Sequence, residues 1–489
     1  MSILVIDVGT SGVRGAVVRP DASVEHIHHV PVLPDTPFPG LVEFDGDAIA
    51  DAVREVASRS LASGGPVAAV GIANQRASTL VWERATGKPV APGLGWQDLR
   101  TVGTCLELQA DGIRIAPNAS ATKLAAILDA TDPDRSRSER GELAFGTIDT
   151  WVAWILSEGD LHVTDASNAA VTGLMHGDGS GWSTHLLAAL RIPEAVLPEI
   201  VDSSGAVGTA RSLAGAPPIA GMAGDQQASL IGQSCTHPGL AKATFGTGGM
   251  LDQCLGTTRP LQAVRGPQGT IPIIAWRRAG SITWGIEAIM LSAGNCVEWL
   301  RDDLGIIDDA ADSAVVAGKC DDTGDVWFVP ALLGLGTPVW DFGARGTFTG
   351  ITRGSGRPEL VRAVLEGVAH RGADLLEAAE IDSGLPIGFL RVDGGMTSNH
   401  VFTQALADAC GRPIEVSPVL EATTLGAAFL AGMAVGTWAN EDDVADAWIP
   451  RSVVDPVGTT AERESARARW LDARSRAEGA VPELSGIDF

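Results

Sequence analysis

The 489-residue sequence contains no tyrosine, and aromatic residues make up only 5% of it. It also has no long apolar run. The longest, residues 425–436, is shorter than the roughly 20 residues that a membrane-spanning helix requires. The first apolar stretch, residues 3–6, ends at Asp7, and no basic region precedes it. That pattern is typical of a strand rather than a signal peptide. We therefore expect a cytoplasmic protein with no membrane partner.

Basic residues are scarce, because 35 Lys and Arg face 60 Asp and Glu, for a net charge of −25. This balance argues against nucleic acid or anionic lipid as partners, although a local basic site can still bind an anionic substrate. The six cysteines are scattered and form no CxxC motif, which argues against a zinc site or a disulfide framework. We expect them to be reduced thiols, mostly in the core. They are Cys105, Cys235, Cys254, Cys296, Cys320 and Cys410.

The nucleotide-binding motif GxxxxGK[ST] is absent, but two segments share another design. Residues 3–18 and residues 243–251 each run from an apolar strand into a Gly/Thr turn and on into a second strand. Such a turn points several backbone N–H groups in one direction, which suits phosphate oxygens. Gly-Thr turns are also common in ordinary hairpins. Two of them, one near the start of each half, indicate a duplicated domain with one ligand between the copies.

Strand and helix patterns alternate along the chain, which predicts an α/β fold with two domains, residues 1–242 and 243–489. We expect strands at residues 66–72 and 390–392. The apolar spacing predicts helices over residues 358–378, 399–410 and 424–435. A last helix, residues 459–477, is rich in Ala, Arg and Glu. We interpret it as a surface helix whose charges form a solvated face.

Blocks distributed over most of the chain resemble the FGGY family of carbohydrate kinases, and most closely its glycerol-kinase-like branch. The strongest are an Asp-Val-Gly-Thr-Ser start, an Asn-Gln-Arg block, a Gly-Asp-Gln-Gln block and a Gly-x-Phe-x-Gly-Ile segment that leads into a Glu-Leu helix opening. These blocks lie at residues 7–14, 71–76, 87–98, 145–151, 163–165, 223–227 and 346–366. The resemblance implies two actin-like (ribonuclease H-like) domains with an interdomain cleft. It also implies ATP-dependent phosphorylation of a hydroxyl group of a small polyol or sugar.

Phosphoryl transfer needs positioned phosphates, a metal ion and an acceptor oxygen in line, and little covalent help. Asp7, at the end of a strand beside the first Gly-Thr turn, is the candidate Mg²⁺ ligand, since Mg²⁺ prefers hard oxygen. Thr10, Ser11 and Arg14 are the candidates for phosphate contact. Asp225 is the candidate general base that accepts the proton of the attacking hydroxyl. The alternatives are that Asp7 caps a hairpin turn and that Asp225 is a helix N-cap.

The resemblance also places Thr247 and Gly248 near the nucleotide phosphates, and Gly294, Gly395 and Asn399 around the adenosine. From the residues alone, the turn at 393–395 follows a strand and lets the backbone approach a ligand closely. The alternative is a tight strand-to-helix turn without a ligand.

In the predicted acceptor pocket, Arg76, Trp96, Asp225 and Gln226 match the family. Three further positions depart from glycerol kinases. Ala77 stands where they carry Glu, Asn118 where they carry Tyr, and Met250 where they carry an aromatic residue. Losing a designed hydrogen bond can change specificity by 10⁴-fold or more. We therefore expect a substrate longer than glycerol, such as a four- to six-carbon polyol or ketose. Glycerol stays open as an alternative substrate if Asn118 or a neighbouring residue restores the contacts to glycerol.

Other readings stay open. Within the family, the chain could be a glycerol kinase proper or a xylulose, ribulose or erythritol kinase. Outside enzymes, it could be a nucleotide-binding regulator without transfer chemistry, although the Asp7 and Asp225 pair favours catalysis. A chaperone-like ATPase is disfavoured because no peptide-binding domain follows. A homo-oligomer is compatible with the sequence, and no charge pattern selects a stoichiometry.

Overall fold

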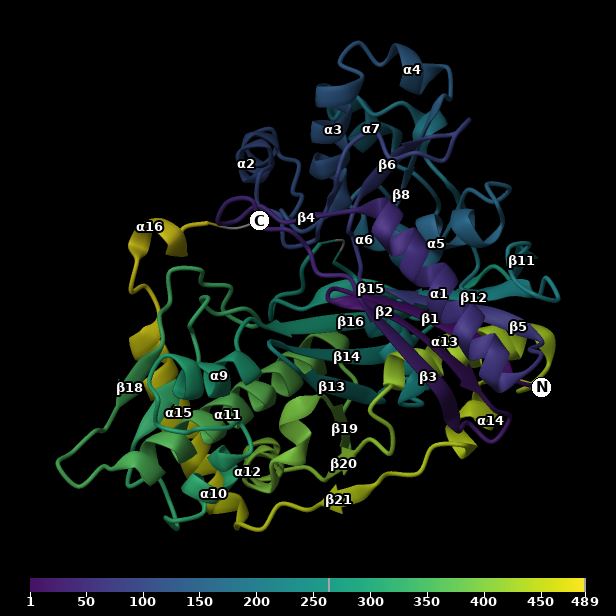
Figure 1. Cartoon of the computed structure of the whole chain (residues 1–489). Helices are drawn as coiled ribbons and strands as arrows, with labels where there is room; N and C mark the ends of the chain where they lie inside the picture. Colours follow the sequence, from purple (N-terminus) through teal and green to yellow (C-terminus); the bar gives the residue numbers. More distant parts are fainter. Residues whose placement is uncertain (263, 488–489) are drawn as a thin grey trace.

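A sheet of 13 strands runs through the whole molecule in the computed structural model, which describes residues 1–262 and 264–487 (Figure 1). Its strands, in spatial order, are β21 (Ser452–Val454), β20 (Ile414–Val416), β19 (Leu390–Asp393), β13 (Ala241–Phe245), β14 (Gly249–Gly256), β16 (Ser281–Met290), β15 (Ile271–Arg278), β11 (Ser204–Thr209), β12 (Pro218–Gly224), β5 (Ala69–Asn74), β1 (Ile3–Gly9), β2 (Gly12–Val18) and β3 (Val24–Pro31). The mixed α/β class expected from the sequence is confirmed.

Each half of the sheet repeats one arrangement. In the first half β1, β2 and β3 are antiparallel, while β5 pairs parallel with β1 and β12 pairs parallel with β5. In the second half β13, β14, β16 and β15 are antiparallel, and β19 and β20 continue the sheet in parallel from β13. The two predicted Gly-Thr hairpins are β1–β2 and β13–β14. The halves meet through a short parallel contact in which Ser204 of β11 pairs with Arg278 of β15.

The two faces of β1 are buried under different helices. Leu4 and Ile6 pack with α1 (Gly46–Gly64), whereas Ile3 and Val5 pack with α13 (Ala422–Val435). Side chains of a strand point alternately to its two faces, so a continuous apolar run is what a strand covered on both faces needs. Residues 3–6 are fully buried. Asp7 follows them, at the edge of this doubly covered layer.

Helix α13 comes late in the chain but packs on the first half of the sheet, against β1, β5, β11 and β12. It crosses α8 (Asp225–Gly232) at two glycines. A Cβ at Gly426 would overlap the carbonyl oxygen of Ala228, and a Cβ at Gly232 would overlap that of Ala422. The crossing therefore tolerates no side chain at either position. The predicted domain boundary at residue 242 falls within β13, and the later return of α13 fastens the two halves together.

The other predicted elements are present with shifted ends. The strand expected at 66–72 is β5, and the helices expected at 358–378 and 399–410 are α11 (Arg357–Ser383) and α12 (His400–Cys410). The remaining longer helices are α2 (Val102–Ala110), α3 (Ser120–Thr131), α5 (Ile148–Leu156) and α9 (Gly294–Asp302). No helix within residues 1–262 and 264–487 is long and apolar enough to cross a membrane.

Helix α15 (Thr460–Ala477) corrects the interpretation of its charges as a solvated face. Trp470 is fully buried and donates from its indole nitrogen to Asp374 of α11, which is also fully buried. Arg467 and Arg474 form ion pairs with the same carboxylate at 2.8 and 3.2 Å. Together with Arg371, which lies 2.6 Å from Asp374 and has the largest lowering effect, these cations hold the pKa of Asp374 down, at about 2, against the opposing effect of its burial. One face of the helix, which carries Trp470, Ala473 and Ala477, therefore docks onto the core, and α16 (Pro482–Ser485) follows it.

The α8–α13 crossing supplies a stability prediction. Gly426→Ala forces α13 away from α8, and we expect it to lower the free energy of unfolding by about 1–3 kcal/mol, the usual cost of overpacking. Because α8 begins at Asp225, the same variant should also impair the site built on that residue.

Gly103→Ala is the matched control, since Gly103 lies in α2 and a Cβ there meets no atom within 4 Å. That variant should be neutral or more stable by about 0.5–1 kcal/mol. Denaturant unfolding of both proteins measures the difference. Equal stability of the two variants would contradict the close crossing.

Candidate active site

Three neighbouring parallel strands deliver the predicted site residues to one edge of the sheet. Asp7 lies near the end of β1, Arg76 follows β5, and Asp225 follows β12. The register places Asp7 opposite Ala73 of β5, and Ala73 opposite Ala223 of β12. Ligands of open α/β sheets bind outside the carboxyl ends of such strands. The fold therefore brings Asp7, Arg76 and Asp225 together at the carboxyl ends of the strands, although about 70 and about 150 positions separate them in the sequence.

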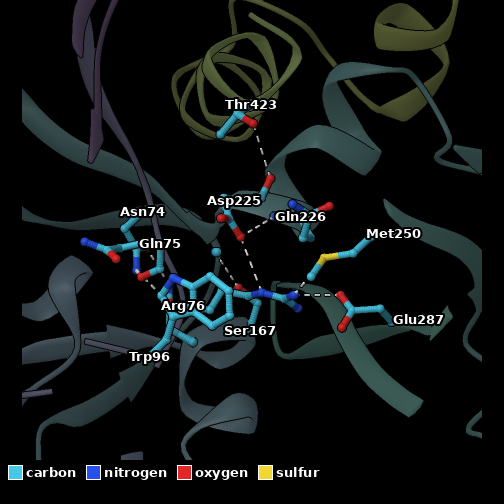
Figure 2. Close-up of polar contacts among 12 residues, drawn as sticks. Asn74, Gln75, Arg76, Trp96, Ser167, Asp225, Gln226, Met250, Glu287 and Thr423 are labelled. Carbon is cyan, nitrogen blue, oxygen red and sulfur yellow. Dashed lines mark hydrogen bonds and ion pairs between the residues drawn. The ribbon is translucent and has the colours of Figure 1, made fainter. Parts of the chain in front are cut away.

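Arg76 is the centre of the polar contacts in this region (Figure 2). Its Nε lies 3.3 Å from Oδ1 of Asp225, and its Nη2 lies 2.7 Å from Oε2 of Glu287 on β16. The same Nη2 lies 3.7 Å from the sulfur of Met250 on β14. The planar guanidinium can satisfy two carboxylates at once because its donors point in fixed directions. It thus joins the end of β5 to the second half of the sheet.

Burial raises the pKa of both carboxyls that Arg76 contacts. The Glu287 side chain is 5% exposed, and burial raises its pKa to about 7, although Arg76 opposes the rise. The Asp225 side chain keeps 35% exposure, and desolvation raises its pKa above the usual value while Arg76 lowers it. A partly exposed carboxylate with a raised pKa is suited to accept a proton near neutral pH.

A second buried cation lies beside Asp225. Lys242 of β13 and Asp252 of β14 are both fully buried and lie 2.7 Å apart. The Lys242 ammonium also donates to Oε1 of Gln226 at 2.6 Å and to the Thr244 hydroxyl at 3.1 Å. Backbone N–H of Gln226 in turn donates to the Asp225 carboxylate at 2.8 Å. The first turn of α8 is thereby tied to the hairpin of the second half.

A buried polar network holds the ends of β5 and β12. The side-chain amides of Asn74 and Asn168 exchange two hydrogen bonds, of 2.9 and 3.0 Å. The Asp165 carboxylate accepts from Ser167 and Asn168, and the Ser167 hydroxyl accepts from the backbone N–H of Gly224 at 3.1 Å. Fully satisfied buried networks rigidify their surroundings. This network therefore holds the residues immediately before Arg76 and Asp225.

The first Gly-Thr hairpin places Asp7 and its predicted partners together. The Asp7 side chain is 13% exposed and lies 3.8 Å from Nη1 of Arg14. Burial raises the pKa of Asp7 to about 6, and Arg14 opposes this shift. Ser11 is exposed at the turn. The Thr10 hydroxyl accepts a hydrogen bond of 3.3 Å from the indole nitrogen of Trp96, which connects the hairpin to the predicted acceptor pocket.

Lys123 of α3 organises the other wall of the predicted pocket. Its side chain is buried, and its ammonium donates to the carbonyls of Trp96, Pro117 and Ala119 at 3.2, 2.8 and 3.3 Å. This ties Trp96 to the segment that carries the exposed Asn118. Burial lowers the pKa of Lys123 to about 8.

Ala77, predicted to line the pocket, is only 4% exposed. Its φ is 60°, and its carbonyl accepts from the Ser120 hydroxyl at 2.9 Å. The residue therefore helps to fasten α3 to the end of β5. Its methyl group leaves little surface for a substrate to contact.

The second hairpin gathers most of the residues predicted around the nucleotide. Backbone N–H of Gly294, at the start of α9, donates to the carbonyl of Gly246 at 2.8 Å, and the N–H of Ala293 donates to the carbonyl of Thr247 at 3.0 Å. A Cβ at Gly294 would overlap the Gly246 carbonyl oxygen. Gly294 and the turn at Thr247–Gly248 are therefore held together by backbone contacts.

The turn after β19 lies against the same hairpin. Gly394 has φ 92°, and a Cβ there would overlap the carbonyl oxygen of Phe245. Its neighbour Gly395 is exposed, and a Cβ there would meet no atom within 4 Å, so its backbone is accessible to a ligand. Asn399 caps α12 instead of pointing freely outward. Its Oδ1 accepts from the N–H groups of Val401 and Phe402, and its Nδ2 donates to Ser313.

Four charged residues of the site were missed from the sequence. They are Lys123, Lys242, Asp252 and Glu287. The last three each stand as a lone charge in a strand that is otherwise uncharged, and this was the signal available. Charged side chains are almost never fully buried unless they are paired. A single charge inside a strand pattern therefore predicts a buried partner, but not which residue that partner is.

Comparison with known proteins identifies what shares this arrangement. Residues 2–232 match the model of the FGGY family of carbohydrate kinases, N-terminal domain, and residues 241–435 match that of the C-terminal domain. A glycerol kinase of Aromatoleum aromaticum is 42% identical over 98% of this chain and 99% of its own length. Glycerol kinase 2 of Thermotoga maritima is 40% identical, again over 98% of this chain and 99% of its own.

Solved structures with the same fold cover the whole chain. The crystal structure of Plasmodium falciparum glycerol kinase with ADP aligns with a TM-score of 0.91 and 28% identity, over 100% of this chain and 99% of that one. A ligand-bound xylulose kinase of Lactobacillus acidophilus aligns with a TM-score of 0.86 and 20% identity, over 99% of both chains. The two halves of the sheet are thus the two domains of an actin-like fold.

The contact between Arg76 and Asp225 generates a pH prediction. If Asp225 accepts a proton in the reaction, kcat/KM falls as pH decreases through its pKa. That fall should lie above pH 3.8, because burial raises the pKa from this ordinary value. Arg76 stabilises the carboxylate, so Arg76→Met should raise the pKa further and move the acid-side fall to higher pH.

Arg76→Lys is the matched variant, since it keeps the positive charge but not the forked geometry. Its acid-side fall should lie between those of the wild type and Arg76→Met. Rates measured with one acceptor at saturating nucleotide across the pH range provide the comparison. An acid-side fall at the same pH in all three proteins would contradict the assignment of this titration to Asp225.

Proposed function

The chain belongs to the FGGY family of carbohydrate kinases, and we propose that Asp225 is the general base with which it activates a hydroxyl group of a small, uncharged polyol or sugar. It is a carbohydrate kinase that uses ATP to phosphorylate a polyol or sugar. In this proposal the Asp225 carboxylate takes the hydroxyl proton while the oxygen attacks the γ-phosphorus of ATP in line. ADP leaves, and the acceptor becomes a phosphate monoester.

One observation carries the proposal. Asp225 is a partly exposed carboxylate with a raised pKa, and it lies at the same sheet edge as the hairpin that carries Asp7, Thr10 and Arg14. Asp7 and Asp225 are close enough for the Asp225 charge to raise the pKa of Asp7. A base and a phosphate-binding hairpin that share one edge can place the acceptor oxygen against a terminal phosphate. The N-cap of α8 is Gly224 and Asp225 is the first residue within the helix, so the alternative of Asp225 as a helix N-cap is wrong.

ATP would lie between the two hairpins, with its phosphates near Thr10, Ser11 and Arg14 on one side and Thr247 and Gly248 on the other. The accessible backbone at Gly395 and the turn at Gly294 support the adenosine side. We also propose a contact between Asn399 and the nucleotide. The side-chain amide of Asn399 caps α12 and bonds to Ser313 at the same time. The glycerol kinase of P. falciparum, whose fold this chain shares, was crystallised with ADP.

Mg²⁺ fits Asp7. Among the described residues, no group of three or more His, Cys, Asp or Glu side chains could enclose a metal ion. A single buried carboxylate beside a phosphate-binding turn matches the way Mg²⁺ is usually held, by one or two carboxylates, water and substrate phosphates. When bound, the ion would neutralise phosphate charge. Arg14, 3.8 Å from Asp7, would share that task from the protein side.

The charges around Asp225 favour an uncharged acceptor. Three cations lie on the acceptor side, and each already has partners: Arg76 has two carboxylates, Lys123 three carbonyls, and Lys242 one carboxylate and two oxygens. A sugar acid would bring its carboxylate next to Asp225 and Glu287, and none of these three cations is free to pair with it. Such like-charge contacts cost several kcal/mol. We propose that the substrate is a neutral polyol or ketose.

Glycerol is the second candidate substrate, and the 42% identity to a glycerol kinase over nearly the full chain supports it. Against it stand Ala77, Asn118 and Met250, which replace the polar and aromatic groups of glycerol kinases. Met250 touches Arg76 and so borders the acceptor side directly. Its flexible side chain adapts to acceptors of different length. We propose an acceptor of four to six carbons, such as erythritol, ribulose or xylulose, acted on in the cytoplasm.

Asp225→Asn tests the base. Asn keeps the size and the N–H contact position but cannot take a proton, so we expect turnover to fall by about 10²- to 10⁴-fold, the usual range for a general base. Affinity for ATP should change little, because Asp225 lies on the acceptor side. Steady-state turnover and nucleotide titration measure the two effects. Turnover within a few fold of the wild type would remove Asp225 from this role.

A panel of acceptors tests the substrate class. We expect ADP release with at least one neutral four- to six-carbon polyol or ketose, and about 10²-fold or more lower kcat/KM with gluconate, because of like-charge repulsion. Coupled ADP detection at fixed ATP and Mg²⁺ covers glycerol, erythritol, pentitols, ribulose, xylulose and gluconate. Highest activity with glycerol selects the second candidate. Highest activity with gluconate would contradict the neutral class, and background rates throughout would favour a nucleotide-binding regulator.

A further inference from the structure

Lys242 has a complete set of acceptors in a fully buried position. An ammonium group has three donors and no acceptor. Here they face Oδ2 of Asp252 at 2.7 Å, Oε1 of Gln226 at 2.6 Å and Oγ1 of Thr244 at 3.1 Å. The three partners come from β14, α8 and β13. Lys242 therefore connects the helix that carries Asp225 to both strands of the second hairpin.

The ammonium also decides which way the Gln226 side-chain amide points. Oxygen must face Lys242, because the alternative orientation would place the amide NH₂ donors against the ammonium donors. The NH₂ group is then directed away from Lys242. In the described part of the chain it makes no hydrogen bond, and Gln226 is only half-buried. Figure 2 shows Gln226 beside Asp225 on the side of Met250, within the acceptor region.

Asp252 is the counter-ion in this arrangement. Its carboxylate lies 2.7 Å from the Lys242 ammonium, whose donors impose one orientation on the amide. Asp252 is itself fully buried, and neither of its carboxylate oxygens accepts a hydrogen bond elsewhere in the described structure. Buried ion pairs are weak sources of stability, because desolvation offsets their attraction. The pair therefore needs an explanation other than stability.

We propose that the Lys242–Asp252 pair is a positioning device that holds Gln226 as an obligate hydrogen-bond donor to the acceptor substrate. This rests on the proposed function and deepens it. Asp225 accepts the proton of the reacting hydroxyl, and Gln226 donates to an oxygen on the neighbouring carbon. The two side chains together recognise a vicinal diol or an α-hydroxy ketone. An acceptor with a donor-only group at that carbon, such as an ammonium, has nothing to offer Gln226.

A double-mutant cycle tests the coupling. Gln226→Met removes the amide at similar size and should raise KM for the acceptor about 3- to 10-fold, the effect of one neutral hydrogen bond. Lys242→Met with Asp252→Leu removes both charges together, so neither member of the pair is left as an unpaired buried charge. We expect this charge-free variant to raise KM by a similar factor. In the triple variant the increase should be no larger than in either parent, because Lys242 acts through Gln226.

The control is Arg362→Met with Glu366→Leu, which removes an ion pair of α11 outside the site and should leave KM unchanged. Melting temperature and ATP affinity show that each variant is folded. A KM increase in the triple variant equal to the product of the two parental increases would overturn the inference, as would an unchanged KM in the charge-free variant. If the wild type releases no ADP with any acceptor of the panel, both the proposed function and this inference are wrong. An active wild type with additive effects overturns the inference alone.

Discussion

The guanidinium of Arg76 is the interaction on which the site depends. It projects from the end of β5 in the first half, contacts Asp225 at the start of α8, and reaches Glu287 in β16 of the second half. Without this cation, the carboxyls of Asp225 and Glu287 would both lose the positive charge that opposes the rise of their pKa on burial. Arg76 therefore does two things at once. It keeps Asp225 able to accept a proton, and it fixes the position of the second half relative to the first.

Close approaches between backbone segments support the contact between Arg76 and Asp225. Gly232 and Gly426 let α8 and α13 cross without side chains between them. Behind it, the amide pair of Asn74 and Asn168 and the Ser167 hydroxyl hold the ends of β5 and β12. In front, Lys242 ties Gln226 to the second hairpin. The chemistry proposed for Asp225 requires such rigidity, because a misplacement of about 1 Å can cost 10²-fold in rate.

Much of the fold was predictable because its signals are local. The two Gly-Thr hairpins, the apolar strand before Asp7 and the long helix after residue 357 follow from periodicity and turn residues. The family resemblance then located Arg76, Asp225 and Gln226. The partners of these residues were not predictable. Glu287 follows Arg76 by more than 200 positions, and pairing at that separation depends on strand order, which no local pattern encodes. The same reason explains why the charges of α15 were misinterpreted, since their partner, Asp374, lies on another helix.

The central claim is transfer of a phosphoryl group to a hydroxyl oxygen activated by Asp225, and the fate of the γ-phosphate tests it most directly. ATP labelled with ³²P at the γ-position is incubated with Mg²⁺, the protein and a neutral polyol or ketose. The label should appear in an acid-stable phosphate monoester of the acceptor, in an amount equal to the ADP formed, and this product should be nearly lost with Asp225→Asn. Label recovered only as inorganic phosphate, at a rate independent of the acceptor, would contradict the account.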